Sequence, residues 1–149
     1  MKHATLLPAA ALALLVPLAL TGCSNPIDTL QKRISGTADT RTALLDAWST
    51  PASDPDWVPA DATDARFVAG TAGETDATPG TVRVTSSSAL PASCTEVERR
   101  SLDSFGEDWA VPVKDLPERV QRCGNWIVVP AKGGWFGWTP LSPHEADQP

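Results

Sequence analysis

The chain has 149 residues, of which 12 are basic and 18 acidic, and its formal net charge is −6. This acidic balance disfavours nucleic acid and anionic lipid headgroups as partners, and the scattered charges are typical of a solvated surface. The length suits one small domain, which excludes the usual two-domain solute-binding subunit of a transporter.

The first 22 residues have the layout of a secretory signal peptide. Lys2 gives a positive start, an apolar run covers residues 4–20, and small residues precede the cysteine that follows. A transmembrane helix needs about 20 apolar residues, whereas this run is shorter and contains Pro8 and Pro17. A cleaved signal peptide over residues 1–22 is therefore the preferred interpretation, with an uncleaved helix and plain secretion as the alternatives.

The residues around Cys23 match a lipid-attachment motif. Leu20-Thr21-Gly22-Cys23 resembles the lipobox of bacterial lipoproteins, in which the cysteine thiol receives a diacylglyceryl group and becomes the first residue of the mature chain. Two acyl chains, such as palmitate, hold a protein stably at a membrane, whereas one gives marginal binding. The resemblance implies that Cys23 is lipidated and anchors the protein on the outer face of the cell membrane.

Residues 23–56 are expected to form a tether that contains a short helix. A weak helical stripe covers residues 24–36, and a better helix is predicted over 38–49, where Leu44 and Trp48 lie four residues apart. A proline and the polar run ASDPD then end this helix.

A small domain is expected over residues 57–140. Apolar alternation and turn residues predict strands, with a short helix after Pro91. The expected strands cover residues 65–70, 81–86, 119–123, 125–131 and 135–139. The fold class is α+β, with an antiparallel sheet of four or five strands and one or two short helices on one face. Residues 141–149 are expected to be a disordered tail.

Two cysteines, Cys94 and Cys123, remain once Cys23 carries lipid. An exported chain folds in an oxidising setting, so this even remainder predicts one disulfide. The sequence contains no Cys-x-x-Cys redox motif, and His144 is the single histidine after the signal peptide. A zinc site of cysteines and histidines is therefore not expected.

Several motifs are shared with one group of proteins. They are WVPADATDAR at 57–66, the Pro-Ala-Ser step before Cys94, CGNW at 123–126 and WFGWTP at 135–140. Together with the lipobox they resemble small actinobacterial lipoproteins that carry a paired cysteine. No activity is assigned to that group, so the resemblance implies a fold and a location and contributes no catalytic residues.

Four aspartates, Asp54, Asp56, Asp61 and Asp64, are the candidate metal ligands. Carboxylates at this density hold calcium in EF-hand loops, but the spacing, the glycine and the distal glutamate of that motif are missing. Aspartate beside proline is also ordinary turn chemistry. The turn and cap roles are preferred, so no metal site and no cofactor are predicted.

The residues needed for catalysis are not evident. General acid–base catalysis requires two positioned titratable groups, and Glu107 and Asp108 are adjacent, so their side chains do not face one another. Common nucleophile motifs are missing, and the serines at 86–88 are better explained as the end of a strand. The chain is therefore not expected to be an enzyme.

Six tryptophans and no tyrosine make up an unusual aromatic supply. Tryptophan rings can stack on sugars or enclose cations, or they can form the core of a small sheet. A hairpin over residues 125–139, with its two-residue turn at 132–133 or 133–134, separates the rings by face. One face holds Ile127, Val129, Phe136 and Trp138 and is assigned to the core; the other holds Trp126, Val128, Pro130 and Trp135 and is expected to be more exposed. Trp135, with Trp126, is the candidate ligand-stacking site.

These features predict a membrane-anchored extracytoplasmic lipoprotein with a non-enzymatic accessory or interaction domain. Its expected contacts are the membrane, through the lipid on Cys23, and an envelope protein or a cell-wall component. The alternative is an envelope module that binds a small ligand or glycan through exposed tryptophans. Two or more rings on one exposed concave face would favour that alternative.

Overall fold

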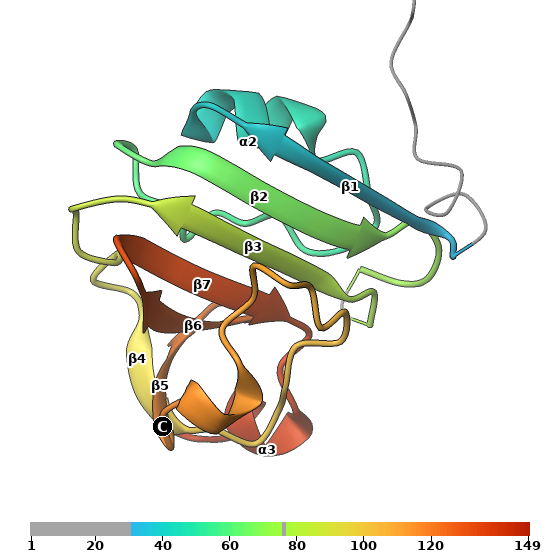
Figure 1. Ribbon diagram of the computed structural model, residues 1–149. Coiled ribbons are helices and arrows are strands. Elements are labelled where there is room, and N and C mark those ends of the chain that lie inside the picture. Colours follow the sequence, from blue (N-terminus) through green and yellow to red (C-terminus); the bar gives the residue numbers. More distant parts are fainter. Residues whose placement is uncertain (1–30, 76) are drawn as a thin grey trace, which may run out of the picture.

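The computed structural model describes residues 31–75 and 77–149, which form one seven-stranded antiparallel sheet in the order β1-β2-β3-β7-β6-β5-β4 (Figure 1). The strands are β1 (Arg33–Ala38), β2 (Thr63–Gly70), β3 (Gly80–Thr85), β4 (Thr95–Glu98), β5 (Arg119–Cys123), β6 (Trp126–Ala131) and β7 (Gly134–Thr139). Helix α2 (Arg41–Ala47), the 3-10 turn η1 (Val113–Asp115) and helix α3 (Pro143–Ala146) complete the elements. The predicted signal peptide and the predicted lipidation site at Cys23 lie outside the described residues.

The fold is mostly β, so the expected sheet of four or five strands is too small. The two additional strands, β1 and β4, are the edges of the sheet. The expected domain boundary at residue 57 is also wrong, because β1 belongs to the sheet and lies within the segment assigned to the tether. In addition, the two helices lie at opposite ends of the sheet and not together on one face (Figure 1).

The strands predicted from alternation and turn residues are confirmed. Those expected at 65–70, 81–86, 119–123, 125–131 and 135–139 correspond to β2, β3, β5, β6 and β7. The helix predicted over 38–49 is α2, where the Thr40 side chain caps the first turn by accepting from the Ala43 N–H at 3.1 Å. The prediction of a short helix after Pro91 is wrong, since strand β4 follows there instead.

The β6–β7 hairpin has the first of the two predicted registers. Val129 faces Phe136 and Ala131 faces Gly134, so Lys132 and Gly133 form the two-residue turn. Gly133, the second turn residue, has φ of 79°, a left-handed backbone that glycine adopts without steric cost. The hairpin therefore presents the two side-chain faces that were predicted.

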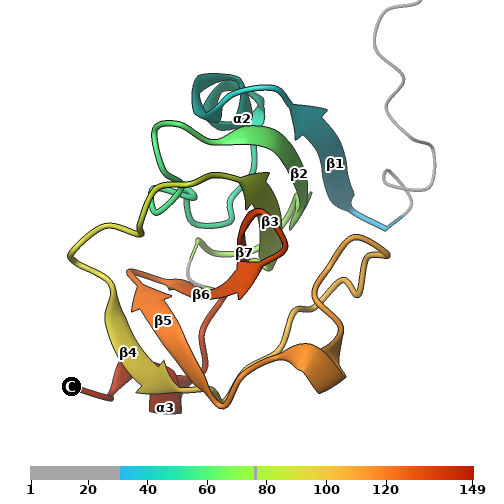
Figure 2. The same cartoon turned by 60° about the vertical axis from the view of Figure 1, so that its left-hand side comes forward.

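Both faces of the sheet are buried, and each has its own core. On one face, a first core gathers Trp48, Trp57, Phe67, Val82 and Trp126 beneath α2 and the segment that follows it. On the other, a second core gathers Val97, Val120, Ile127, Val129, Phe136 and Trp138. Figures 1 and 2 show the corresponding layers, with the long connection between β4 and β5 crossing the second face.

The expectation that the Trp126 face is the more exposed one is wrong for half of its members. Trp126 is buried because Trp57 and Trp48 pack against its ring, and Val128 is buried in the same core. Trp57 comes so close that a Cβ on Gly137 would lie 2.6 Å from its ring. Pro130 is exposed and Trp135 half-buried, as predicted.

The expected disordered tail at 141–149 contains ordered structure. Helix α3 is held by a reciprocal capping box between Ser142 and Glu145. The tail was misjudged because its composition is polar, whereas its order comes from contacts with the end of β4. The described residues contain no helix long and apolar enough to cross a membrane.

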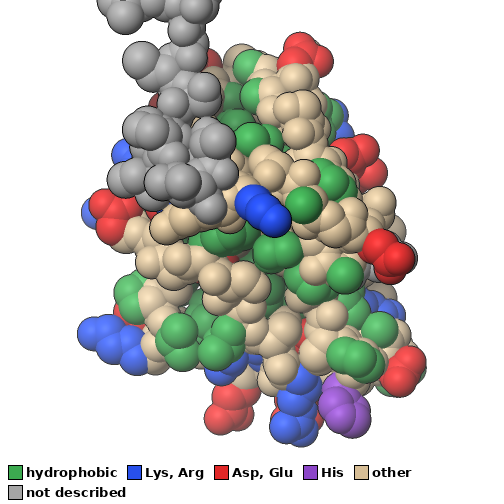
Figure 3. All heavy atoms as spheres, turned by 90° about the vertical axis from the view of Figure 1, so that its right-hand side faces the viewer, with side chains coloured by type: hydrophobic (Ala, Val, Ile, Leu, Met, Phe, Trp, Pro, Cys, Tyr) green, Lys and Arg blue, Asp and Glu red, His purple; other side chains and the backbone are tan. Residues whose placement is uncertain are grey.

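The predicted disulfide is present. Cys94 and Cys123 are bonded, with their Cα atoms 4.4 Å apart. The bridge precedes the first β4–β5 pair, Thr95 and Arg122, so it joins the start of β4 to the end of β5. Acidic and basic side chains are interspersed on the face shown in Figure 3, in agreement with a solvated surface.

Candidate functional site

Two hollows flank the disulfide on the surface, and they form the candidate site. One has a volume of about 550 Å³ and the other about 470 Å³, and both are bordered by Pro91 and Cys94. We call the pair the disulfide trough. Because its two halves share a wall, one elongated partner can contact both.

The larger half of the trough is polar at its rim. Its lining includes the exposed Asp54 and Asp56, and Asn125, whose amide donates to the Ser53 hydroxyl at 3.2 Å. Trp126 lies beneath them and donates its indole N–H to the Asp54 carbonyl at 3.0 Å. This half suits a partner that offers hydrogen-bond donors.

The smaller half is largely apolar. Its lining includes the side chains of Leu90, Pro91, Pro117, Val120, Val128, Pro130 and Trp135. Trp135 is half-buried and donates its indole N–H to the Ser88 carbonyl at 2.9 Å, which fixes the ring against the 86–90 segment. At the rim, Arg119 and Glu96 form an exposed ion pair with a nitrogen–oxygen distance of 3.0 Å. A fixed aromatic ring beside a charged rim is a common arrangement in binding surfaces.

The structure separates the two candidate stacking residues. Trp135 lines the apolar half of the trough, and its role in stacking stays a prediction. Trp126 has 2% of its surface exposed, so the expectation that a ligand stacks on it is wrong: Trp48 and Trp57 already pack against its ring. The trough therefore lacks the pair of exposed rings that would favour a glycan module.

The four candidate aspartates do not converge. Asp54 and Asp56 border the trough, whereas Asp61 accepts hydrogen bonds from the Ser86 hydroxyl at 2.6 Å and the Ser87 N–H at 3.2 Å. The Ser86 hydroxyl in particular lowers the pKa of Asp61, so its carboxylate stays ionised and anchors the serine run. Within the described residues, no group of three His, Cys, Asp or Glu side chains could hold a metal ion.

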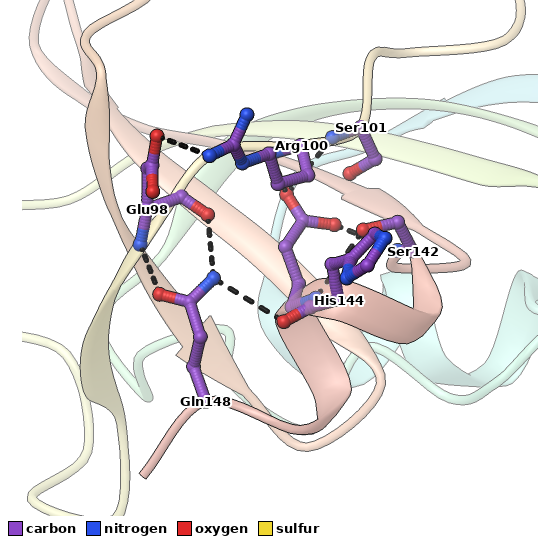
Figure 4. Close-up of polar contacts among 7 residues, drawn as sticks. Glu98, Arg100, Ser101, Ser142, His144 and Gln148 are labelled. Carbon is purple, nitrogen blue, oxygen red and sulfur yellow. Dashed lines mark hydrogen bonds and ion pairs between the residues drawn. The ribbon is translucent and has the colours of Figure 1, made fainter.

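Sequence reasoning missed a clasp formed by residues 142–148, shown in Figure 4. Glu145 is fully buried, and its Oε1 accepts the Arg100 N–H at 2.6 Å and the Ser101 N–H at 2.9 Å, while its Oε2 accepts the Ser142 N–H at 2.7 Å. Burial raises the pKa of this carboxyl, but these hydrogen bonds outweigh burial and hold the pKa below its ordinary value of 4.5. The carboxylate thus ties the tail to the chain that leaves β4.

The clasp also binds the last residue of β4 at the free edge of the sheet. The Gln148 amide accepts the Glu98 N–H at 2.6 Å and donates to the Glu98 carbonyl at 3.0 Å, as a neighbouring strand would (Figure 4). Arg122 donates to the carbonyls of Glu145, Ala146 and Gln148. An open edge strand is a template for unwanted pairing, and Gln148 occupies the N–H and carbonyl of Glu98 at the end of this edge.

Glu145→Gln is expected to lower the free energy of unfolding by about 1–3 kcal/mol at neutral pH, because the amide cannot accept all three backbone N–H groups. Since the folded-state pKa lies below 4.5, the stabilisation by Glu145 is complete above that pH and is lost as pH falls through the folded-state pKa. Urea midpoints of the natural protein and the variant should therefore converge on acidification.

Glu118→Gln is the matched control, since this exposed side chain lies outside the clasp. It should leave both the midpoint and its pH dependence unchanged. A stability difference between Glu145→Gln and the natural protein that stays constant down to about pH 3 would contradict the role of the carboxylate.

Comparisons with known proteins found no relative of this chain. No protein-family model, curated protein or solved structure matches the chain significantly.

Proposed function

We propose that the protein is a membrane-anchored extracytoplasmic lipoprotein whose β domain binds an envelope partner and performs no catalysis. The observation that carries the proposal is the Cys94–Cys123 bridge beside the trough. Disulfides persist in oxidising compartments and are rare in the cytosol. The lipobox at Cys23 supports the same location from the opposite end of the chain.

A binding role is supported by the chemistry of the trough and of the carboxylates. General acid–base catalysis works best with a pKa near the operating pH. The resolved shifts at Asp61 and Glu145 both lower the pKa, which keeps these groups ionised at neutral pH. Their hydrogen bonds hold loops and the clasp in place, as structural carboxylates do.

The partner is proposed to contact the trough through Trp135. The alternative is a small ligand or glycan that stacks on this single ring, and the observation in its favour is the polar half of the trough next to it. A photo-reactive residue placed at Glu96, on the rim, distinguishes the two. A discrete protein adduct is expected there, and none from the same residue placed at the exposed Asp46 of α2.

For the alternative, isolated cell walls replace the cross-linking partner. Retention of the domain by cell walls that is lost in Trp135→Ala, without any protein adduct at Glu96, would show the glycan module. Equal cross-linking at both positions would contradict a specific trough.

The anchor is tested at Cys23. Cys23→Ser should leave a precursor that gains no lipid mass, because the thiol that receives the diacylglyceryl group is gone. Mass spectrometry of the membrane fraction measures this. A double variant, Cys94→Ser with Cys123→Ser, is the matched control and should still carry lipid. A natural mature chain without added lipid mass would refute the anchor.

A further inference from the structure

A third hollow, of about 360 Å³, lies away from the trough and gathers basic side chains. Arg66 of β2, Arg83 of β3 and Lys132 of the β6–β7 turn line it, together with Asp64 and Trp109. Three cations against one carboxylate give a local excess of positive charge. This excess is unusual in a chain with more acidic than basic residues.

The two arginines are directly opposite each other in the sheet. The register pairs Arg66 with Arg83 across β2 and β3. Opposed residues of an antiparallel pair point to the same face with their Cβ atoms about 5 Å apart, and like charges in that arrangement are destabilising. Such a pair costs stability unless other contacts or a bound ligand compensate for it.

No acidic side chain neutralises the pair. Among the arginines in the described part of the chain, Arg66 alone has a side chain that makes no hydrogen bond or ion pair. Arg83 uses Nη1 to donate to the Trp109 carbonyl at 2.6 Å, and Lys132 at the turn has no partner within the described residues. The donors of Arg66 and Lys132, and those left on Arg83, are therefore available to a ligand.

The backbone of β2 is irregular beside Arg66. The β2–β3 register shifts between Thr63 and Arg66, and Asp64 has φ of 49°, in the left-handed region. Bulges of this kind redirect side chains and are frequent next to functional sites, and non-glycine residues in this conformation store strain. The bulge therefore supports a site at this position independently of the charged side chains.

One wall of the hollow is an aromatic ring that is held in place before any ligand binds. Trp109 contacts Phe136 edge to face, with ring centroids 6.5 Å apart, and its carbonyl is held by Arg83. Asp103, earlier in the same connection, accepts a hydrogen bond from the Thr81 hydroxyl of β3. A ligand therefore meets a ring that does not need to be ordered on binding, which favours affinity.

We propose that this hollow binds an oxyanion, a phosphate or a carboxylate, attached to a ring or other flat apolar body. The guanidinium of Arg66, with Arg83 and Lys132, receives the anion, because arginine matches phosphate and carboxylate oxygens with two parallel N–H groups. The apolar body packs on Trp109. The hollow and the disulfide trough share no lining residue, so this proposal is independent of the proposed function.

The test uses three probes that share a phenyl ring: phenyl phosphate, benzoate and the uncharged phenol. Chemical shifts of the Trp109 indole N–H and the Arg66 side-chain N–H report binding in the folded protein. Saturable shifts are expected with at least one anion and not with phenol, and they should weaken with added salt. The stronger of the two anions identifies phosphate or carboxylate as the natural group.

Substitutions that change the charge of the hollow test the proposal by the direction in which they change the affinity for the anion. Arg66→Gln should weaken binding about tenfold, and Asp64→Asn should tighten it about threefold by removing the opposing charge. Asn tolerates the left-handed backbone at that position. Lys114→Gln, an exposed lysine outside the hollow, is the matched control and should change nothing. Equal effects of Arg66→Gln and Lys114→Gln, weaker binding by Asp64→Asn, or no saturable shift with either anion would overturn the site.

Discussion

Removal of the Cys94–Cys123 bridge is expected to lower the free energy of unfolding by about 3–4 kcal/mol. The two cysteines are 29 residues apart in sequence, and the chain-entropy model gives a loop of that length this value. A domain of this size has a total stability of only about 5–15 kcal/mol. Thermal unfolding followed by circular dichroism, with and without a reductant, measures the loss.

The position of the bridge predicts which strand loses stability first when the bridge is removed. The bridge precedes β4, which has only four residues and pairs with β5 alone. In a variant with Cys94→Ser and Cys123→Ser, amide exchange should accelerate most in β4 and least in β3, an inner strand separated from β4 by β7, β6 and β5. A reductant should leave this double variant unchanged, which controls for effects other than the bridge. Two free thiols in the folded protein would contradict the prediction.

Local patterns predicted the centre of the sheet but not its edges. The segment TVRVT of β3 alternates, and β6 is apolar between turn residues, so the strands and the β6–β7 register followed from the sequence. Strand β1 contains a glycine, and Gly36 is there because a Cβ would lie 2.8 Å from the Phe67 ring. Strand β4 buries only Val97. Neither strand has an alternating apolar pattern of its own, because each is stabilised mainly by its contacts with a neighbouring strand.

The site residues divide in the same way. The alternation of side chains along the hairpin was sufficient to place Trp135 and Trp138 on opposite faces. It could not show that Trp48 and Trp57, from elsewhere in the chain, cover Trp126. The clasp did leave a signal that was missed, because Ser142-Pro-His-Glu145 has the spacing of a capping box.

The opposed arginines left no local signal. Arg66 and Arg83 are adjacent only through the β2–β3 register, and a bulge shifts that register beside Arg66. A cluster that depends on a long-range register requires the fold before it can be seen.

Trp138→Ala is expected to lower the free energy of unfolding by about 3–5 kcal/mol, because it removes the largest side chain of the second core. Trp138 has 1% of its surface exposed, and its ring centroid lies 5.8 Å from that of Phe136. Its indole N–H also donates to the Ser101 hydroxyl at 2.9 Å, next to the backbone that Glu145 holds. The substitution therefore leaves a cavity and loosens the attachment of the clasp.

Trp135→Ala is the matched comparison on the same strand. Its ring is half-buried at the edge of the first core, so we expect a loss of about 1–2 kcal/mol from partial burial and from the hydrogen bond to Ser88. Urea denaturation of both variants measures the difference. Because Trp135 borders the trough, its variant should keep the fold while partner cross-linking falls, whereas Trp138→Ala should weaken both together. Equal destabilisation by the two substitutions would contradict the assignment of Trp138 to the core and of Trp135 to the proposed binding surface.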